Sequence, residues 1–429
     1  MSIIYIIVIL AFIESLILIM ASIRGLIFIL TVIFKREKKS EDSKPNPEPD
    51  PEKYFVSVLL PIYNEVNVVD RLLRACTSFT FPSYEVIVVD DSTDETVEIL
   101  KKWRKHPKVK VIHRNHRKGW KGGALNTALE NLNPKSTHIM VFDADFIPPP
   151  NLLEKFLEKF ENNNEIMIVQ GYQRHTLNKD ENWVTKGIRV LHSMIYLVEF
   201  DAKSKLGLPV PVTGSVFMIR TELLKKFRFS EDITEDWNLT MRLYAQGYKV
   251  HYDPELVAFA ECPSGLLEYF CQQMRWAEGH TRNYKRHLWR VLTSKKLSLK
   301  EKLEFMILAI SCINAVPMIM LLVAWILAFL FPSLFPEVYS SPLIPLSMYL
   351  SLPSIPVVVI ANTLAMIIDG TTRDALWLPY TILLYYITLP GVAFAVFKGL
   401  LTKEYREFFR RTYKTGKITD KSVLSWIRE

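Results

Sequence analysis

Two carboxylates, Asp143 and Asp145, stand one residue apart directly after the apolar run "HIMVF". A short apolar run of this kind is typical of a buried strand, so both acids are expected at a strand end. Carboxylate oxygens suit Mg²⁺ or Mn²⁺, which usually keep waters and take further ligands from substrate phosphates. The pair therefore predicts a divalent-cation site that receives a diphosphate, although strand-end acids often serve only in turns.

A second acidic pair, Glu235 and Asp236, precedes the amphipathic segment "WNLTMRLYA". Thr234 is expected to cap this helix, which places both acids in its first turn. The helix dipole stabilises acids there and fully explains one of them. The other is free to face a binding crevice, where a carboxylate could act as a general base.

A glycine-rich stretch, "GWKGGALN" at Gly119 to Asn126, opens another expected helix. It is not a P-loop, because no Gly-Lys-Ser/Thr follows at the required spacing. Glycines at a helix start let backbone amides approach an anion, and Lys118 and Lys121 could add positive charge. A tight turn with solvated lysines explains the same residues equally well.

The segment "CQQMRWAEGHTRNYKRHLWR", from Cys271 to Arg290, combines cations and aromatic rings. Arg275 offers a planar fork for phosphate oxygens, and Trp276 offers a flat face for a sugar ring. An amphipathic helix at a membrane surface, with its tryptophan at headgroup level and its basic face on lipid, is the alternative. Both interpretations can hold for different residues of the segment.

The elements that must position these residues alternate between strands and helices. Apolar β-branched runs lie in "FVSVLLPIYNE", "YEVIVVDDSTDE", "VKVIHR" and "HIMVFDAD", and segments with helical spacing separate them. This alternation predicts an α/β fold with a mostly parallel sheet and helices on both faces. Ligands of such sheets bind outside the carboxyl ends of the strands. We expect one crevice to collect the polar clusters at these ends: residues 63–65, 90–92, 113–114 and 143–145.

Four segments are apolar and long enough to cross a membrane, which takes about 20 residues. They are Ile3 to Phe34, Phe305 to Phe331, Leu343 to Ile368 and Leu376 to Leu401. A signal peptide is the alternative for the first, but a basic start and a small-residue cleavage site are missing. A chain of 429 residues is long enough for one enzyme domain and a further part, and the apolar segments supply that further part.

The net charge of +8 is concentrated beside the apolar segments. Basic residues follow the first and last of them: Lys35, Arg36, Lys38, Lys39, Lys403, Arg406, Arg410, Arg411 and Lys414. Such residues stay on the cytoplasmic side and meet anionic headgroups, so the polar middle of the chain is expected in the cytoplasm. Nucleic-acid binding is disfavoured, because there is no basic-aromatic stripe of a binding module. The four cysteines form no Cys-x-x-Cys pair and are expected to be reduced and structural.

The count of membrane crossings conflicts with the charge pattern. Three crossings after the polar middle would leave the basic tail outside, against the positive-inside rule. The proline-rich stretch from Pro342 to Pro356 is a candidate for a re-entrant segment or a further crossing. We expect a cytoplasmic tail and leave the number of crossings open.

Taken in order, these motifs resemble the family 2 glycosyltransferases, and more narrowly the membrane-embedded branch of cellulose, hyaluronan and mannan synthases and ceramide glucosyltransferase. The resemblance covers Val56 to Tyr284. Its motifs are "PIYNE", "VVDDSTDE", "KGGALN", "DAD", "GS", "TED" and "QQMRW". The resemblance implies a GT-A fold, a Rossmann-like variant of the α/β sheet, flanked by transmembrane helices and interfacial amphipathic helices.

The resemblance also implies roles for individual residues. Pro61, Tyr63, Glu65 and Asp91 correspond to the wall around the nucleotide base and ribose, and Lys121 lies near the diphosphate. Asp145 corresponds to the more direct metal ligand of the pair, with Asp143 nearer the ribose. Asp236, with Glu235 beside it, corresponds to the catalytic base. The remaining substrate-binding positions are Gly214, Ser215, Gln272, Arg275 and Trp276.

The expected organisation is a transmembrane helix (residues 1–36), a proline-rich linker (37–53), the catalytic domain (54–262), amphipathic interface helices (263–302), transmembrane segments (303–402) and a basic tail (403–429). The expected activity is inverting, Mg²⁺- or Mn²⁺-dependent transfer of a hexose from a UDP- or GDP-sugar to a β-linked polysaccharide at the inner face of the plasma membrane. Membrane lipids are expected partners and nucleic acid is not. Transfer of one sugar to a lipid is the nearest alternative, and a non-catalytic membrane scaffold is the alternative from another class.

Overall fold

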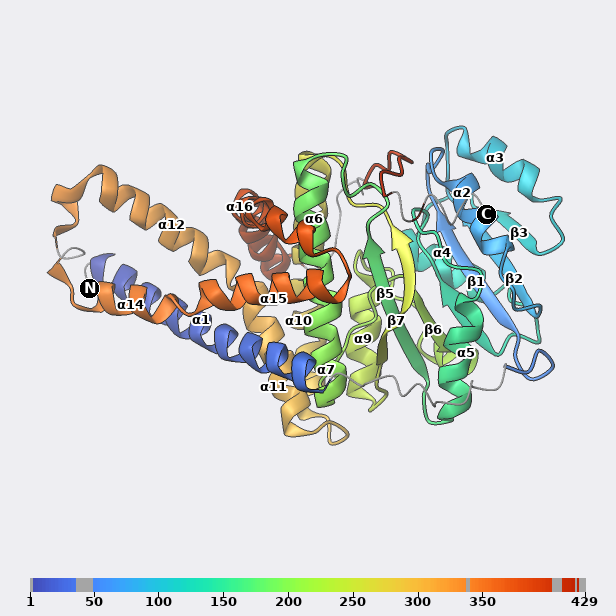
Figure 1. Ribbon diagram of the computed structural model, residues 1–429, viewed down its shortest axis with the longest axis horizontal. Helices are drawn as coiled ribbons and strands as arrows, with labels where there is room; N and C mark the ends of the chain where they lie inside the picture. The colour runs from blue at the N-terminus through green and yellow to red at the C-terminus, as the bar shows by residue number, and fades with distance from the viewer. Residues whose placement is uncertain (1–2, 36–48, 337–339, 403–410, 421–422, 424–429) are drawn as a thin grey trace.

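The computed structural model describes residues 3–35, 49–336, 340–402, 411–420 and 423. Figure 1 shows a broad α/β part from whose one end several long helices project. Most of the expected linker (37–53) and much of the basic tail (403–429) lie outside the described residues, and so do Arg36, Lys38, Lys39, Lys403, Arg406 and Arg410.

A seven-stranded sheet forms the centre of the α/β part. Its strands are β1 (Val56–Ile62), β2 (Tyr84–Asp90), β3 (Val109–His113), β4 (His138–Val141), β5 (Ile168–His175), β6 (Phe217–Arg220) and β7 (His251–Ala260). Their order is β3-β2-β1-β4-β6-β5-β7, and only β6 pairs antiparallel to its neighbours. The expected mostly parallel sheet is confirmed.

The strand order reverses between β1 and β4. From β1 the chain moves outward to β2 and β3 and then returns to place β4 on the other side of β1. Helices that leave neighbouring strands in opposite directions open a crevice at such a switch point. The residues that follow β1 and β4 are therefore placed beside one another, although about 80 residues of sequence separate them.

Two apolar cores cover the two faces of the sheet. Val58 and Leu60 of β1 face one core, and Leu59 faces the other, as the two-residue period of a strand requires. The helices of the α/β part are α2 (Val69–Thr77), α3 (Thr96–Trp103), α4 (Trp120–Leu129), α5 (Leu152–Asn162), α8 (Thr221–Phe227) and α9 (Glu235–Ala245). The first core includes α2 and α5, and the second includes α4, α8 and α9.

Four further elements close the edge of the sheet nearest the projecting helices. They are α6 (Trp183–Met194), which continues through the π-helix η1 (Ile195–Phe200) into α7 (Asp201–Leu206), and the long helix α10 (Leu266–Thr293). Tyr196 and Phe200 of η1 pack in one cluster with Phe28 of α1 (Ile3–Phe34) and Ala365 of α15 (Ser354–Ile368). This cluster joins the α/β part to the projecting helices.

Four helical segments in the described part of the chain are long and apolar enough to cross a membrane. The first is α1, and the second combines α11 (Leu299–Ile313) and α12 (Ala315–Leu330). The third combines α14 (Leu343–Ser351) and α15, which follow one another along α1 (Figure 1). The proline-rich stretch thus forms two consecutive helices with a short turn at residues 352–353, and a re-entrant segment or a further crossing there stays a prediction. Short 3₁₀ turns lie at Pro332–Leu334 and Thr372–Trp377.

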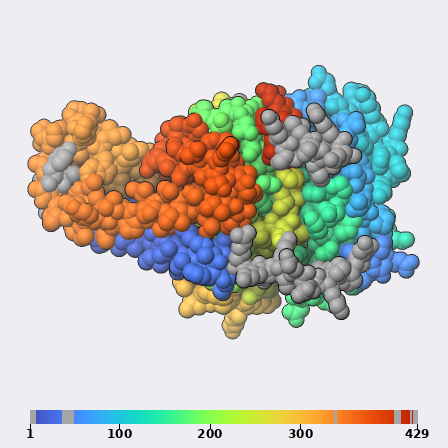
Figure 2. All heavy atoms as spheres, in the orientation of Figure 1, coloured from blue at the N-terminus to red at the C-terminus, as the bar shows by residue number. Residues whose placement is uncertain are grey.

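The fourth apolar helix, α16 (Leu378–Leu401), runs differently from the others. Near its start, Thr381 Oγ1 donates to the carbonyl of Gly187 in α6 at 2.7 Å, and at its end Lys285 Nζ of α10 donates to Leu400 O at 2.6 Å. Both ends are thus held by helices of the α/β part, whereas α12 and α14 lie in the narrower extension in Figure 2 and α15 leads from that extension back to the α/β part. This course allows residues 411–420 to return to the α/β part.

Candidate active site

A cavity of about 510 Å³ opens at the switch point of the sheet. Most of the residues expected in the site line it: Pro61, Tyr63, Glu65, Asp91, Lys121, Asp143, Asp145, Glu235, Asp236, Gln272, Arg275 and Trp276. Gly214 and Ser215 lie immediately behind this lining. His113 and Arg114, expected in the same crevice, do not line it and instead bond Asp90 and Asp91 from behind.

The paired acids after β4 face the cavity with different exposure. The Asp143 side chain is 38% exposed, and its backbone N–H donates to Ser215 Oγ at 3.0 Å. Asp145 is buried, at 4% exposure. Its Oδ2 lies 2.5 Å from Lys414 Nζ, while Asp143 Oδ1 lies 2.7 Å from Lys121 Nζ. Each carboxylate thus pairs with the ammonium group of a lysine, so a positive charge already lies beside each of the two acids.

This donor set fits a hard divalent cation. Among the described residues no group of three or more His, Cys, Asp or Glu side chains is placed to hold a metal ion. Two carboxylates that line a cavity still suit Mg²⁺ or Mn²⁺, because these ions take their other ligands from water and phosphate. Asp143 and Asp145 are therefore the residues that could hold such an ion.

The acids that open α9 face Lys121 across the same cavity. Lys121 Nζ lies 3.4 Å from Glu235 Oε1 and donates to the carbonyl of Gly214 at 2.8 Å. Burial raises the pKa of Glu235 to about 7, while Lys121 acts in the opposite direction. Burial also raises the pKa of Asp236. One lysine thus connects the acid after β4 with the acidic pair, and a raised pKa suits a proton acceptor working near neutral pH.

Gly214 has a structural reason to be glycine. Its φ is +77°, and a β-carbon there would lie 2.9 Å from Asp236 Oδ2 and 3.1 Å from Lys121 Nζ. Any side chain would therefore be strained and would displace the two charged groups. Ser215, which follows, accepts the hydrogen bond from Asp143 N. From behind the cavity lining, Gly214 thus packs against Asp236 and Ser215 bonds the backbone of Asp143.

The glycines of α4 lie close to neighbouring backbone. A β-carbon on Gly122 would lie 2.0 Å from the carbonyl oxygen of Ser230, and one on Gly123 would lie 2.0 Å from that of Lys118. Both glycines are needed because backbone approaches this closely. This packing gives the tight-turn alternative a structural reason, while the anion cradle of backbone amides stays a prediction. Lys121 of the segment points its charge at Asp143 and Glu235.

The far wall of the cavity comes from η1 and α10. Trp276 lines the cavity, with its ring centre 6.4 Å from that of His192. Gln272 Oε1 is a buried acceptor without a hydrogen-bond partner in the part of the chain described. Ile195 and Phe200 add apolar surface. This wall combines an aromatic face with an unsatisfied polar atom, a combination that suits a sugar ring.

The wall near β1 is built on a cation stacked on a ring. The guanidinium of Arg117 lies 3.5 Å from the ring centre of Tyr63. Arg114 bonds both carboxylate oxygens of Asp91, at 2.7 and 2.5 Å. A ligand in the cavity would therefore contact Asp91 through carboxylate oxygens that already bond Arg114. Sequence reasoning missed Arg117, because nothing in its neighbourhood distinguishes it from the other basic residues of "HRNHRKGW".

The larger omission is the C-terminal strap, residues 411–420. Besides the contact of Lys414 with Asp145, Arg411 lies 3.2 Å from Glu65, and the backbone N–H groups of Thr415 and Gly416 donate to Glu261 Oε2. Arg411 and Lys414 were expected at lipid headgroups, and that expectation is wrong for both. Burial raises the pKa of Glu65 to about 8, although Arg411 and Lys414 lower it. Residues 411–420 thus lie against the α/β part, and the cytoplasmic location of the tail stays a prediction.

Comparisons with known proteins agree with this geometry. Residues 57–228 match the family model described as Glycosyl transferase family 2. "Probable glucomannan 4-beta-mannosyltransferase 7" of Oryza sativa subsp. japonica is 29% identical over 58% of this chain and 44% of its own length. "Glucomannan 4-beta-mannosyltransferase 1" of the same plant is 26% identical over 64% of this chain and 55% of its own length. This chain thus spans about half the length of the curated relatives it matches.

A solved structure extends the likeness to the fold of nearly the whole chain. The mannosyltransferase PcManGT of Pyrobaculum calidifontis, in complex with GDP-Man and Mn²⁺, has a TM-score of 0.58 and 20% identity, covering 93% of this chain and 100% of that one. The α/β part with its mixed, mostly parallel sheet is therefore of the GT-A type.

Proposed function

Because this chain carries a family 2 glycosyl transferase domain, we propose that it transfers a hexose from a nucleotide sugar to a growing β-linked polysaccharide at the cytoplasmic face of the plasma membrane. The observation that carries the proposal is the arrangement around Lys121, which brings Asp143 and Glu235 to one ammonium group in a single cavity. The acids proposed to bind the metal, Asp143 and Asp145, therefore line the same cavity as the pair that contains the proposed base.

In the proposed reaction, Asp236 accepts the proton of the acceptor hydroxyl as its oxygen attacks the anomeric carbon. Glu235 beside it is held close to Lys121. Attack comes from the face opposite the nucleotide, so the anomeric configuration inverts and no covalent glycosyl-enzyme forms. Arg275, in the cavity wall, is placed to hold oxygens of the departing diphosphate. A divalent cation bound by Asp143 and Asp145 would supply further positive charge for that diphosphate.

The names of the curated relatives make mannose the first sugar to test. Both relatives are named glucomannan 4-beta-mannosyltransferases, which favours a β-1,4-linked mannosyl product, and the solved structure of PcManGT holds GDP-Man, which makes GDP-mannose the donor to test. Trp276 and Gln272 Oε1, which has no partner among the described residues, would contact the acceptor end. Four apolar helices favour a membrane location, and the basic residues that follow α1 and α16 in the sequence favour a cytoplasmic α/β part.

Transfer of a single sugar to a membrane lipid is the second candidate, and one observation favours it. None of the described residues of α1, α12, α14, α15 or α16 lines the cavity, so it does not continue as a channel between the projecting helices. Instead its far wall is formed by η1 and α10, which contribute Ile195 and Trp276. An amphiphilic acceptor could present its sugar end to this wall from the membrane surface.

Product analysis separates the two candidates. Membranes containing the full chain would be incubated with radiolabelled GDP-mannose or UDP-glucose and either Mn²⁺ or Mg²⁺. With GDP-mannose we expect label in an alcohol-insoluble polymer, and we expect a β-mannanase to release that label. A single chloroform-soluble glycolipid would refute the polymer and establish the lipid acceptor.

The same assay tests the mechanism through Asp236→Asn. Removal of the proton acceptor should lower turnover by about 10²- to 10⁴-fold while binding of the nucleotide is retained. That result would also dismiss a non-catalytic scaffold, which has no turnover to lose. A fully active Asp236→Asn enzyme would refute the assignment of Asp236 as the base.

A further inference from the structure

Thr234 occupies the N-cap position of α9 but does not cap the helix as expected. An N-cap threonine ordinarily accepts a hydrogen bond from a backbone N–H in the first turn, worth about 1 kcal/mol. Here no side-chain capping bond forms. Thr234 Oγ1 instead accepts a hydrogen bond of 2.9 Å from Asn283 Nδ2 of α10, which also reaches the Thr234 carbonyl at 3.3 Å. The Thr234 hydroxyl therefore links α9 to α10 and does not cap the first turn of α9.

The backbone of α10 is shaped to allow this contact. A β-carbon on Gly279 would lie 2.5 Å from Thr234 Oγ1 and 2.6 Å from its Cγ2. Arg275, Gly279 and Asn283 are spaced four residues apart and therefore share one face of α10. The same face thus contacts the cavity through Arg275 and fixes the start of the acidic pair through Asn283.

Asn283 is held in a single orientation by a polar network. It is fully buried, and its Oδ1 accepts a hydrogen bond of 2.8 Å from Asn238 Nδ2 of α9. Asn238 Oδ1 accepts in turn from Arg242 Nε at 2.7 Å. Because every polar atom of the Asn283 amide has a partner, its rotation would leave buried groups unsatisfied.

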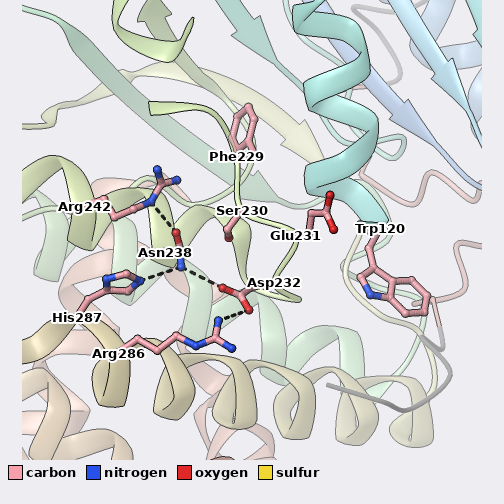
Figure 3. Close-up of a pocket in the computed structure, with 9 residues that line it drawn as sticks. All are labelled: Trp120, Phe229, Ser230, Glu231, Asp232, Asn238, Arg242, Arg286 and His287. Carbon is pink, nitrogen blue, oxygen red and sulfur yellow. Dashed lines mark hydrogen bonds and ion pairs between the residues drawn. The ribbon is translucent and has the colours of Figure 1, made fainter. Parts of the chain in front are cut away.

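Figure 3 shows the outer side of this network, in a second cavity of about 670 Å³. Asn238 donates to Asp232 Oδ2 at 3.0 Å, and Arg286 of α10 bonds the other oxygen of Asp232 at 2.5 Å. Asp232 and Trp120 line both cavities, so residues 229–234 form the partition between them. The segment leading into the acidic pair is therefore held from α9 and α10 on its outer side.

We propose that Asn283 is a positioning residue that fixes the carboxylates of Glu235 and Asp236 through Thr234 and keeps them in register with Arg275 on the same helix. This role rests on the proposed function. Movement of α10 by even part of an ångström would move the proton acceptor and the diphosphate-binding guanidinium together. Nothing in the role requires Asn283 to touch a substrate.

The test compares Asn283→Ala and Thr234→Val with a matched control on α10. Thr281 is also buried, but its hydroxyl donates within the helix to Ala277 O at 2.7 Å, so Thr281→Val removes a buried hydroxyl away from the acids. Release of GDP from GDP-mannose by the full chain in membranes gives kcat. Binding of GDP with Mn²⁺ to the detergent-solubilised protein, measured calorimetrically, gives a readout that does not depend on turnover.

Displacement of reacting groups by about 1 Å costs on the order of 10²-fold in rate, so Asn283→Ala and Thr234→Val should each lower kcat by about 10- to 100-fold. Nucleotide affinity should stay within about twofold, since binding groups remain in place. The double variant should be no slower than the slower single variant, because both remove one contact. Thr281→Val should keep its kcat.

Three results would overturn the role. They are an unchanged kcat in Asn283→Ala, losses of kcat and nucleotide affinity in the same proportion, or additive losses in the double variant. If neither wild type nor Thr281→Val released a nucleotide from any donor, the proposed function would fail and the positioning role with it. An active wild type beside an equally active Asn283→Ala refutes the positioning role alone.

Discussion

Gly214→Ala is the substitution for which the structure gives the most direct expectation. Alanine at φ +77° costs about 1 to 2 kcal/mol of stability, because the left-handed region brings its β-carbon against the backbone. In addition that β-carbon would lie 2.9 Å from Asp236 Oδ2 and 3.1 Å from Lys121 Nζ. The carboxylate and the ammonium must then move by a few tenths of an ångström.

The two costs can be separated with a second glycine. Gly370 has nearly the same φ, +73°, but a β-carbon there would meet no heavy atom within 4 Å. Gly370→Ala should therefore lose about 1 to 2 kcal/mol of unfolding free energy and keep its kcat. Gly214→Ala should lose at least as much stability and about 10-fold or more in kcat, because the displaced carboxylate is the proposed base.

The assay is GDP release from GDP-mannose together with thermal unfolding of both variants in the same detergent. Equal kcat in the two variants, with equal shifts in the unfolding midpoint, would refute the reasoning. It would mean that Asp236 and Lys121 relax around the methyl group without consequence.

Three other perturbations test the charges of the cavity. Lys414→Met should tighten binding of Mn²⁺ to the nucleotide-free protein, because it removes the ammonium that lies 2.5 Å from Asp145 Oδ2; unchanged affinity in a calorimetric titration would contradict this. In the presence of EDTA the unfolding midpoint should fall as pH rises from about 4.5 to about 8. Burial raises the pKa of Glu65 from 4.5 to about 8 in the folded state, so the folded protein binds a proton in this range that the unfolded chain has lost. Glu65→Gln should make that profile less steep, with the rest of the slope left to Glu235, whose pKa burial also raises, and an equally steep profile in the variant would assign the effect elsewhere. EDTA should abolish nucleotide release and either Mn²⁺ or Mg²⁺ should restore it, whereas turnover that persists in EDTA would exclude a role for the Asp143 and Asp145 pair in holding a metal.

The positions of the strand-end residues follow from sequence where the sheet is parallel. Apolar runs identify β1, β2 and β4, and the carboxyl ends of parallel strands meet on one edge. Asp143 and Tyr63 accordingly reach the same cavity. His113 does not, because β3 is the outermost strand and two strands separate it from the switch point. Strand order is a property of long-range pairing and leaves no local pattern.

Capping at Thr234 illustrates a correct local rule overruled by packing. The residue does stand at the start of α9, as its type and position predict. Its hydroxyl bonds Asn283, 49 residues away, because Gly279 lets α10 approach closely. No pattern near Thr234 indicates which helix will pass beside it.

Motif chemistry and element type were determined by the sequence itself. Acid pairs, apolar periodicity and the order of the motifs are properties of short windows, and short windows decide strands, helices and the groups at their ends. The tertiary structure alone decided that α16 is held at both ends by the α/β part, and that Lys414 lies on Asp145 and not at a lipid headgroup. Both outcomes depend on the burial of a specific partner, which is gained only when segments distant in sequence meet, so the free energy that selects them is absent from any local stretch of the chain.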